Sequence, residues 1–334
     1  MPVFYSFFAS VENDLWGSLS NKLPQRSLFF RRRDRVKVYT ITPQEITMTY
    51  LLLATCSSAV MAIVLKIFQN SKGNRYGIIL GNYLICILIS WLSLPDRTIV
   101  LRGSPATILC GLIGGFFFVA GLVTMQTSTR INGATLTSVF AKMGLVISLA
   151  VSIFVFGEKP TPMQIAGVAL ILAALVLVNG PADEKSESAM QTGRIHTGAL
   201  ILTMLASGGG SAMSKIFEQV GTRDQDELFF LYVFFVAAVL TAGLLIMEWK
   251  RTGKALLWRE MAAGIAVGIP NYYASFLLLL ALVALPAILV YPINSTGSIL
   301  IVMAVDALVF HQKYTRRQWL GILLVLVSMV LLNL

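Results

Sequence analysis

Lys142 has the clearest potential for chemistry in this sequence, because it stands in the middle of a long apolar segment. An ionised side chain at the centre of a bilayer costs at least about 2.5 kcal/mol, so a lysine at that depth predicts a function. Thr135 and Ser138 precede it by seven and four residues and share its helical face. We expect Lys142 to receive an anionic or carboxylate group of a small solute. The alternative is a buried ion pair with Asp306.

A second polar face lies in the apolar segment 286–309. Tyr291, Ser295, Ser298 and Asp306 follow one another at spacings of four, three and eight residues, which places them on one side of a helix. We expect this face to line a cavity. Pro292 removes a backbone donor from the same helix, which indicates either a kink in a moving helix or a static bend.

Asn271 and Tyr272 form a polar and aromatic patch within the apolar segment 259–283. Tyrosines in membrane proteins often mark the interface between lipid and water. These two residues lie twelve or more positions into the segment, so we expect them in the wall of a cavity instead.

Lys66 and Lys215 stand near the ends of two apolar segments that finish alike, with Lys-Ile-Phe-Gln and Lys-Ile-Phe-Glu. Snorkelling of the ammonium groups to the membrane surface is one interpretation. The other is that these lysines, with Pro292, gate a cavity from opposite faces of the membrane. Glu218 follows Lys215 by three residues and can neutralise it.

The elements that must position these residues are membrane-spanning helices. Of the 334 residues, 56% are hydrophobic and 13% are charged, against roughly 25% charged in an average soluble domain. The mean hydropathy is +0.77. A hydrocarbon core about 30 Å thick takes about 20 apolar residues per helix. Runs of that length predict about ten spans, near 47–67, 76–95, 105–126, 133–155, 162–180, 197–217, 227–247, 259–283, 286–309 and 318–334.

The composition argues against several other functions. The net charge of +10 fits basic loops beside anionic head groups better than nucleic-acid binding. All three cysteines fall in apolar runs, and both histidines fall in predicted connections, so neither a disulfide framework nor a metal or haem site is expected. We expect no cofactor. An enzyme would need a nucleophile, a base and a stabilising group together at membrane depth, and the spans offer no such set.

The chain contains an internal repeat. Phe156-Gly157-Glu158-Lys159, followed by Gln164 and Gly167, recurs as Phe310-His311-Gln312-Lys313, followed by Gln318 and Gly321. Five spans per half is an odd number, so the second half must enter the membrane upside down, as in secondary transporters. The sequence therefore predicts an all-α membrane protein of two inverted five-helix repeats. Its expected segments are a basic arm at 1–46, repeats at 47–180 and 197–334, and a polar linker at 181–196.

These features resemble the EamA-domain transporters of the drug/metabolite transporter superfamily. The resemblance rests on ten spans in two halves and on the Phe-x-Glu/Gln-Lys turn that opens the last helix of each half, and it covers residues 47–334. It implies a transporter fold with both termini in the cytoplasm. It does not indicate a substrate, because such families export amino acids, other metabolites and drugs.

The basic residues conflict with that orientation. With both termini inside, the inner loops hold four basic residues and the outer loops twelve, against the positive-inside rule. The seven basic residues of the arm nearly restore the balance. The arm is either a cytoplasmic amphipathic segment on anionic lipid, or a stretch that is not translated because synthesis starts at Met48.

We therefore expect a secondary transporter in the cell membrane that moves an amino acid, organic acid or other anionic or zwitterionic metabolite by alternating access, with export favoured. The first span offers only Thr55, Ser57 and Ser58 where small exporters of cationic drugs need a carboxylate. A multidrug or cation exporter and a lipid flippase or channel are the alternatives. The expected partners are the small-molecule substrate, a coupling proton or other ion, and the lipid bilayer, with the chain a monomer or homodimer.

Overall fold

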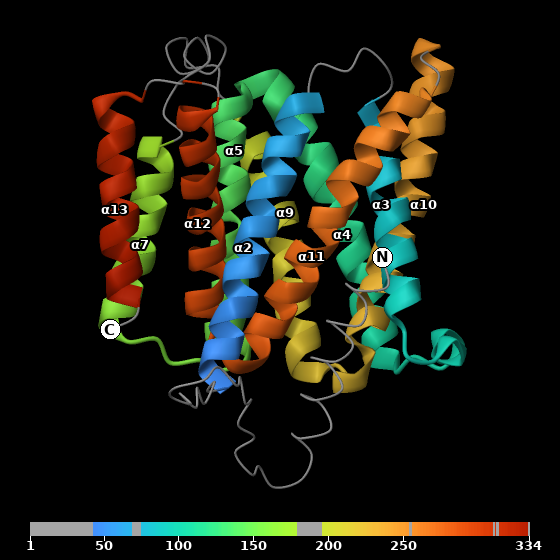
Figure 1. Ribbon diagram of the computed structural model, residues 1–334, viewed down its shortest axis with the longest axis horizontal. Coiled ribbons are helices and arrows are strands. Elements are labelled where there is room, and N and C mark those ends of the chain that lie inside the picture. Colours follow the sequence, from blue (N-terminus) through green and yellow to red (C-terminus); the bar gives the residue numbers. More distant parts are fainter. Residues whose placement is uncertain are drawn as a thin grey trace, which may run out of the picture. The chain divides into compact units, whose positions relative to one another are not determined.

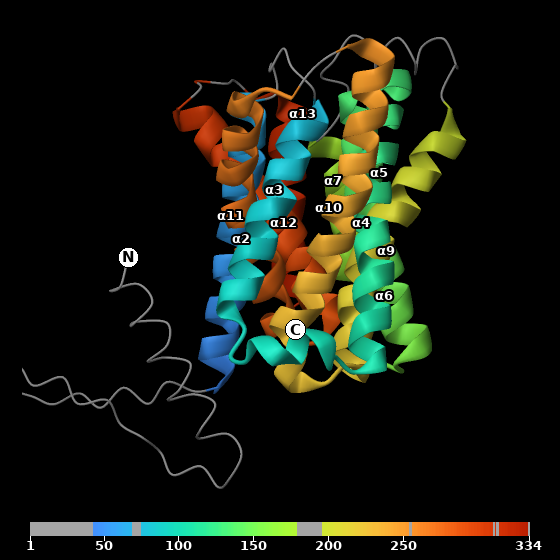
Figure 2. The same ribbon diagram turned by 90° about the vertical axis from the view of Figure 1, so that its right-hand side faces the viewer.

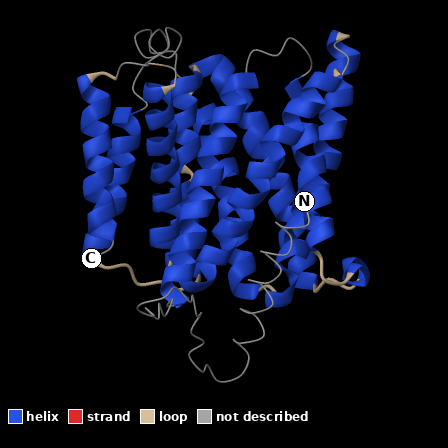
Figure 3. Ribbon diagram, in the orientation of Figure 1, coloured by secondary structure: helices blue, strands red, loops and turns tan. Residues whose placement is uncertain are grey.

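The computed structural model describes residues 43–68, 75–178, 196–253, 256–309, 311 and 314–332, and within these ranges the chain is helical with no strand (Figure 3). Most of the predicted arm and linker, and Phe310, Gln312 and Lys313 of the second motif, lie outside the described residues. The α-helices are α2 (Pro43–Phe68), α3 (Arg75–Ser93), α4 (Pro105–Asn132), α5 (Ala134–Met143), α6 (Leu145–Ala150), α7 (Pro162–Val178), α9 (Thr197–Val220), α10 (Asp226–Thr252), α11 (Trp258–Ala284), α12 (Ala287–Leu308) and α13 (Arg316–Leu332).

Eight stretches in the described residues are long and apolar enough to cross a membrane, which confirms the predicted all-α membrane fold. One of them, Leu136–Val155, runs through α5, α6 and the π-helical turn η2 (Val151–Val155). Helices α7 and α13 have 17 residues each, at the short end of what spans a hydrocarbon core. They pack against each other at one edge of the bundle (Figure 1).

The helices pair across the two halves of the chain. Helix α3 packs against α10 and α11, and α4 packs against α9 and α10 (Figures 1 and 2). If α3 corresponds to α10 and α4 to α11, the α3–α11 pair and the α4–α10 pair are equivalent. This exchange of partners is what two repeats related by an in-plane axis produce.

The first and second halves differ in how tightly their first helices are held. Helix α9 packs along α4, α5 and α6. In the described part of the chain, its counterpart α2 has no neighbour packed over a comparable length. It touches α12 where the Ser58 hydroxyl donates to Asn294 Oδ1 at 3.3 Å. The two halves are therefore not in the same packing state.

The fourth span is broken by glycines, although the sequence predicted one continuous helix over 133–155. Gly133, with φ of +85°, lets the chain turn from α4 into α5 without a loop. Gly144 separates α5 from α6. A Cβ on Gly144 would lie 2.7 Å from the backbone nitrogen of Gly208, so the missing side chain allows α9 to approach closely.

Candidate substrate cavity

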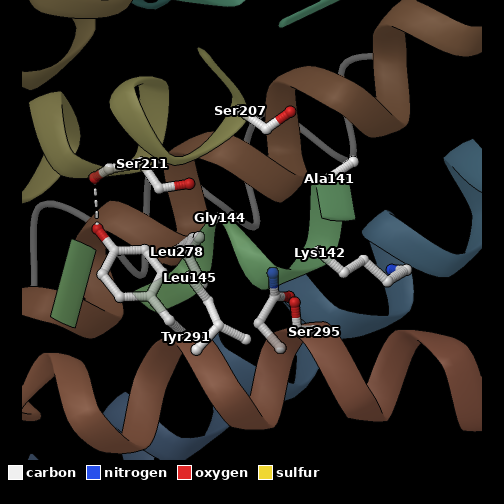
Figure 4. A pocket seen from close by; sticks show the side chains of 10 residues that line it. Ala141, Lys142, Gly144, Leu145, Ser207, Ser211, Leu278, Tyr291 and Ser295 are labelled. Atoms are coloured by element: carbon white, nitrogen blue, oxygen red, sulfur yellow. Dashed lines mark hydrogen bonds between the residues drawn. The ribbon is translucent and has the colours of Figure 1, made fainter. Parts of the chain in front are cut away.

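A cavity of about 230 Å³ lies between helices of the two halves (Figure 4). Helices α5 and α6 contribute from the first half, and α9, α11 and α12 from the second. Its wall carries one charged and several polar side chains: Lys142, Ser207, Ser211, Tyr291, Asn294 and Ser295. A cavity with a few convergent polar groups at a domain interface is typical of a small-molecule site.

Lys142 lines this cavity from the C-terminal end of α5. It stands in the last turn of α5, two residues before Gly144. Figure 4 shows its side chain at the end of the cavity away from Tyr291. The cationic end of the cavity thus lies in the first half of the chain, and the hydroxyl groups around it come from α9 and α12.

A second cavity of about 280 Å³ adjoins the first. Ser207, Ser211, Leu278 and Tyr291 belong to the walls of both. The second wall also takes residues from α2, α3 and α4. The two cavities are therefore neighbouring chambers of one central space.

Tyr291 stands where the two chambers meet. Its hydroxyl donates to the backbone oxygen of Ser211 at 2.7 Å and so joins α12 to α9. Figure 4 shows this bond at one end of the polar chamber. The tyrosine ring is part of both walls, so its hydrogen bond fixes a shared boundary of the chambers.

Tyr291→Phe is expected to lower the free energy of unfolding by about 1 kcal/mol, the usual net value of one hydrogen bond, and to weaken ligand binding in the cavity. Tyr314→Phe is the matched control, because the Tyr314 hydroxyl donates to Met303 O at 2.7 Å but lies in neither cavity. Thermal melting of both variants with and without ligand checks this. Equal ligand stabilisation in the two variants would contradict a role for Tyr291 in the site.

A buried ion cluster lies at the end of α9. The Lys215 ammonium is 3.0 Å from Glu158 Oε1 and 2.8 Å from Glu218 Oε2, and only 2% of the Lys215 side chain is exposed. The expected neutralisation by Glu218 is present. Snorkelling is not, because the side chain is enclosed by protein and paired with Glu158 from the other half.

Glu158 is brought to Lys215 by the turn that follows η2. A π-helix carries an extra residue per turn and frequently marks a functional site. Gly157 next adopts φ of +71°, and the Glu158 N–H donates to Ser152 O at 3.1 Å. Glu158 Oε1 also accepts from the Ala287 N–H at 3.3 Å, in the first turn of α12, where the helix dipole favours a carboxylate.

We call the surface at which α9 and α13 end and α12 begins the closed face (Figures 1 and 2). The Lys215–Glu158 pair and the Glu158–Ala287 bond lie there and tie together α9, α12 and the segment before α7. Two helices that line the central space, α9 and α12, are thus held together at one end through Glu158.

The structure brings four of the sequence-predicted residues into the chambers. Lys142, Tyr291 and Ser295 line the polar chamber. Asn271 lines the second chamber with Tyr291, and its Nδ2 donates to Asn82 Oδ1 on α3 at 3.1 Å. These residues come from three helices that are distant in sequence.

Tyr272 lies elsewhere than the sequence predicted. It is 2% exposed and stacks on Phe276 with ring centroids 5.7 Å apart, within an aromatic cluster that includes Phe234. Consecutive helical residues point about 100° apart, so the neighbour of Asn271 faces away from the chamber. Of Asn271 and Tyr272, which were both expected in the cavity wall, only Asn271 lines a chamber.

Ser298 and Asp306 do not line either chamber, although they share the helical face of Ser295. The Ser298 hydroxyl donates to Ser295 O at 2.9 Å. Asp306 lies eleven residues beyond Ser295, about 16 Å along α12. Of the two residues in the alternative ion pair, Lys142 lines a chamber and Asp306 does not, and Lys215 pairs with Glu158 across the halves.

The remaining predicted residues have varied places. Ser138 is half-buried on α5 outside both walls. Pro292 is buried within α12, which continues through it, and its carbonyl accepts from the Thr296 hydroxyl at 2.6 Å. The side chains of Thr135 and Lys66 lie outside those that the structure describes.

Several residues of the site were not predicted as such. Ser207 and Ser211 flank the Gly208–Gly210 run and stand four residues apart, a spacing that could have indicated one polar helical face. Asn294 carried no signal beyond its neighbours. Glu158 was visible only as a motif residue, and its pairing with Lys215 depends on packing between the halves.

Comparison with known proteins finds a family model that matches part of the first half of the chain, and a solved structure of similar fold that covers most of the chain. Residues 45–180 match the model of the EamA-like transporter family. A solved structure, titled "Crystal structure of protein", is similar with a TM-score of 0.68 and 16% sequence identity, over 86% of this chain and 97% of that chain. At that identity the likeness shows the fold alone. No curated protein matches the sequence.

Proposed function

We propose that this chain is a secondary transporter of a small anionic or zwitterionic metabolite, such as an amino acid or organic acid. Residues 45–180 match the EamA-like transporter family, and eight stretches in the described residues are long and apolar enough to cross a membrane, which supports the proposal. The observation that carries the proposal is the position of Lys142, in the wall of a cavity between the two halves. Inverted-repeat transporters hold their substrates at such an interface.

The chemistry of the polar chamber supports an anionic group. Lys142 is the only ionisable side chain in its wall apart from the Tyr291 phenol, among the residues that the structure describes. A cation in a site of low dielectric attracts an anion more strongly than it would in water. Ser207, Ser211, Ser295 and Asn294 supply neutral hydrogen-bonding groups that suit a carboxylate or a zwitterion.

The unequal packing of α2 and α9 supports alternating access. The ion cluster and the tight packing of α9 fit a carrier whose central space is shut off from the water at the closed face. In the repeat-related arrangement, α2 would take the packing that α9 has here. We propose that both termini are cytoplasmic, so that the closed face is the inner one, and that the physiological direction is export.

A thermal-shift measurement tests the substrate class. A ligand that binds only the folded protein raises its melting temperature, by an amount that grows with concentration. We expect anions or zwitterions to stabilise the purified protein and Lys142→Gln to abolish this effect. Lys159→Gln is the matched control, because Lys159 is exposed and lines neither chamber. Stabilisation by cations alone, or by anions equally in both variants, would contradict the proposal.

A further inference from the structure

The second chamber differs chemically from the first. Its wall includes Met61, Phe117, Phe118, Leu122 and Met125, from α2 and α4, together with further aliphatic residues of α3 and α11. None of the described residues that line it carries a charged side chain. The central space thus has a polar, cationic chamber and an apolar, aromatic one.

The sizes of the chambers indicate that they act together. A pocket that buries a small ligand usually measures about 300 Å³ or more. The chambers measure about 230 and 280 Å³, so each falls below that size and their sum exceeds it. Four residues, Ser207, Ser211, Leu278 and Tyr291, are common to the two walls, which makes it possible for one ligand to reach into both.

We propose that the apolar chamber is a subsite for a large aliphatic or aromatic group of the transported solute. The substrate class is then an amphipathic carboxylate or zwitterion, with its carboxylate beside Lys142 and its apolar group between α2, α4 and α9. This inference rests on the proposed function and narrows it. Methionine and phenylalanine suit such a subsite, because thioethers and aromatic rings adapt to apolar groups of different shape.

The test uses ligands of one charge pattern and increasing apolar size: glycine, alanine, leucine and phenylalanine, with phenethylamine as the counterpart without a carboxylate. Binding is measured on the full-length protein in lipid nanodiscs. Each buried methylene is worth about a fourfold gain in affinity. We expect affinity to rise at least about tenfold from alanine to leucine or phenylalanine.

Two variants separate the chambers. Met125→Gln makes the apolar wall polar at nearly constant length, and Met125 is partly exposed, so the fold is expected to persist. Gly121→Ala narrows the chamber, where the added Cβ would meet Ser207 at an ordinary 3.6 Å. Both are expected to reduce the gain with apolar size, whereas Lys142→Gln is expected to weaken all four amino acids alike. Gly198→Ala is the control, since nothing lies within 4 Å of its Cβ position.

The outcomes distinguish this inference from the function on which it rests. If all four amino acids bind equally, or if the gain with size survives in Met125→Gln and Gly121→Ala, the apolar subsite is wrong and the anionic transporter stands. If phenethylamine binds and the amino acids do not, the proposed function itself is wrong. A size-dependent affinity that both chamber variants remove supports the subsite.

Discussion

Glu158→Gln is expected to open the closed face and to lower the free energy of unfolding by about 3 kcal/mol. The substitution keeps the shape of the side chain and an oxygen for the Ala287 N–H, but it removes the charge opposite Lys215. Breaking a buried pair by removing one partner costs about 3–5 kcal/mol, because the other charge stays buried. We expect the lower end of this range, since Glu218 still faces Lys215 at 2.8 Å.

Melting of the purified variant measures the stability, and the double variant Glu158→Gln/Lys215→Met measures the coupling. The double variant leaves no unpaired ammonium, so it is expected to be less destabilised than the sum of the two single variants. Asp224→Asn is the control, because Asp224 is an exposed acid. An unchanged melting temperature in Glu158→Gln would show that the ion pair holds nothing together.

Gly208→Ala is expected to destabilise the protein by about 1–3 kcal/mol, whereas Gly210→Ala, two residues later, is expected to be neutral or slightly stabilising. A Cβ on Gly208 would collide with the backbone oxygen of Gly144 and lie 2.8 Å from Ile147 Cδ1. Overpacking of this kind forces a backbone shift. A Cβ on Gly210 meets only Phe118, at 3.4 Å, and alanine favours a helix by up to about 1 kcal/mol over glycine.

The two alanine variants form a matched pair, because they make the same change in one glycine run on one helix. Melting temperatures in the same detergent give the comparison directly. Gly208→Ala is expected to melt at a lower temperature than Gly210→Ala. Equal melting temperatures would mean that α9 can move away from Gly144 without a cost in free energy. The close contact between Gly208 and Gly144 would then not contribute to stability.

Most of the fold could be predicted from the sequence, because membrane spans are set by length and hydropathy. The predicted span 259–283 corresponds to helix α11, Trp258–Ala284, and the predicted span 286–309 corresponds to helix α12, Ala287–Leu308. The break in the fourth span was missed, since Gly144 has ordinary helical dihedrals and is needed for its contact with Gly208, not for a turn. A contact between halves leaves no periodic signal in either segment.

For the candidate site, the sequence predicted the direction in which side chains point around the helix axis, but not the level along that axis at which the cavity lies. Helical spacing placed Tyr291, Ser295, Ser298 and Asp306 on one face, and the structure places only the first two in a chamber wall. Periodicity gives the direction of a side chain around the helix axis. The level at which the cavity ends along that axis depends on the neighbouring helices, which the pattern does not contain.

Labelling of a cysteine in the cavity distinguishes an alternating-access carrier from a continuous pore. Ser211→Cys lies in the wall of both chambers, in a background where the exposed Cys56 is replaced by serine. A membrane-impermeant maleimide is added to one side of proteoliposomes at a time. In the packing state described here, faster labelling is expected from the side opposite the closed face, and Glu158→Gln is expected to add labelling through the closed face. Equal labelling from both sides with Glu158 in place would contradict this expectation and indicate a continuous pore.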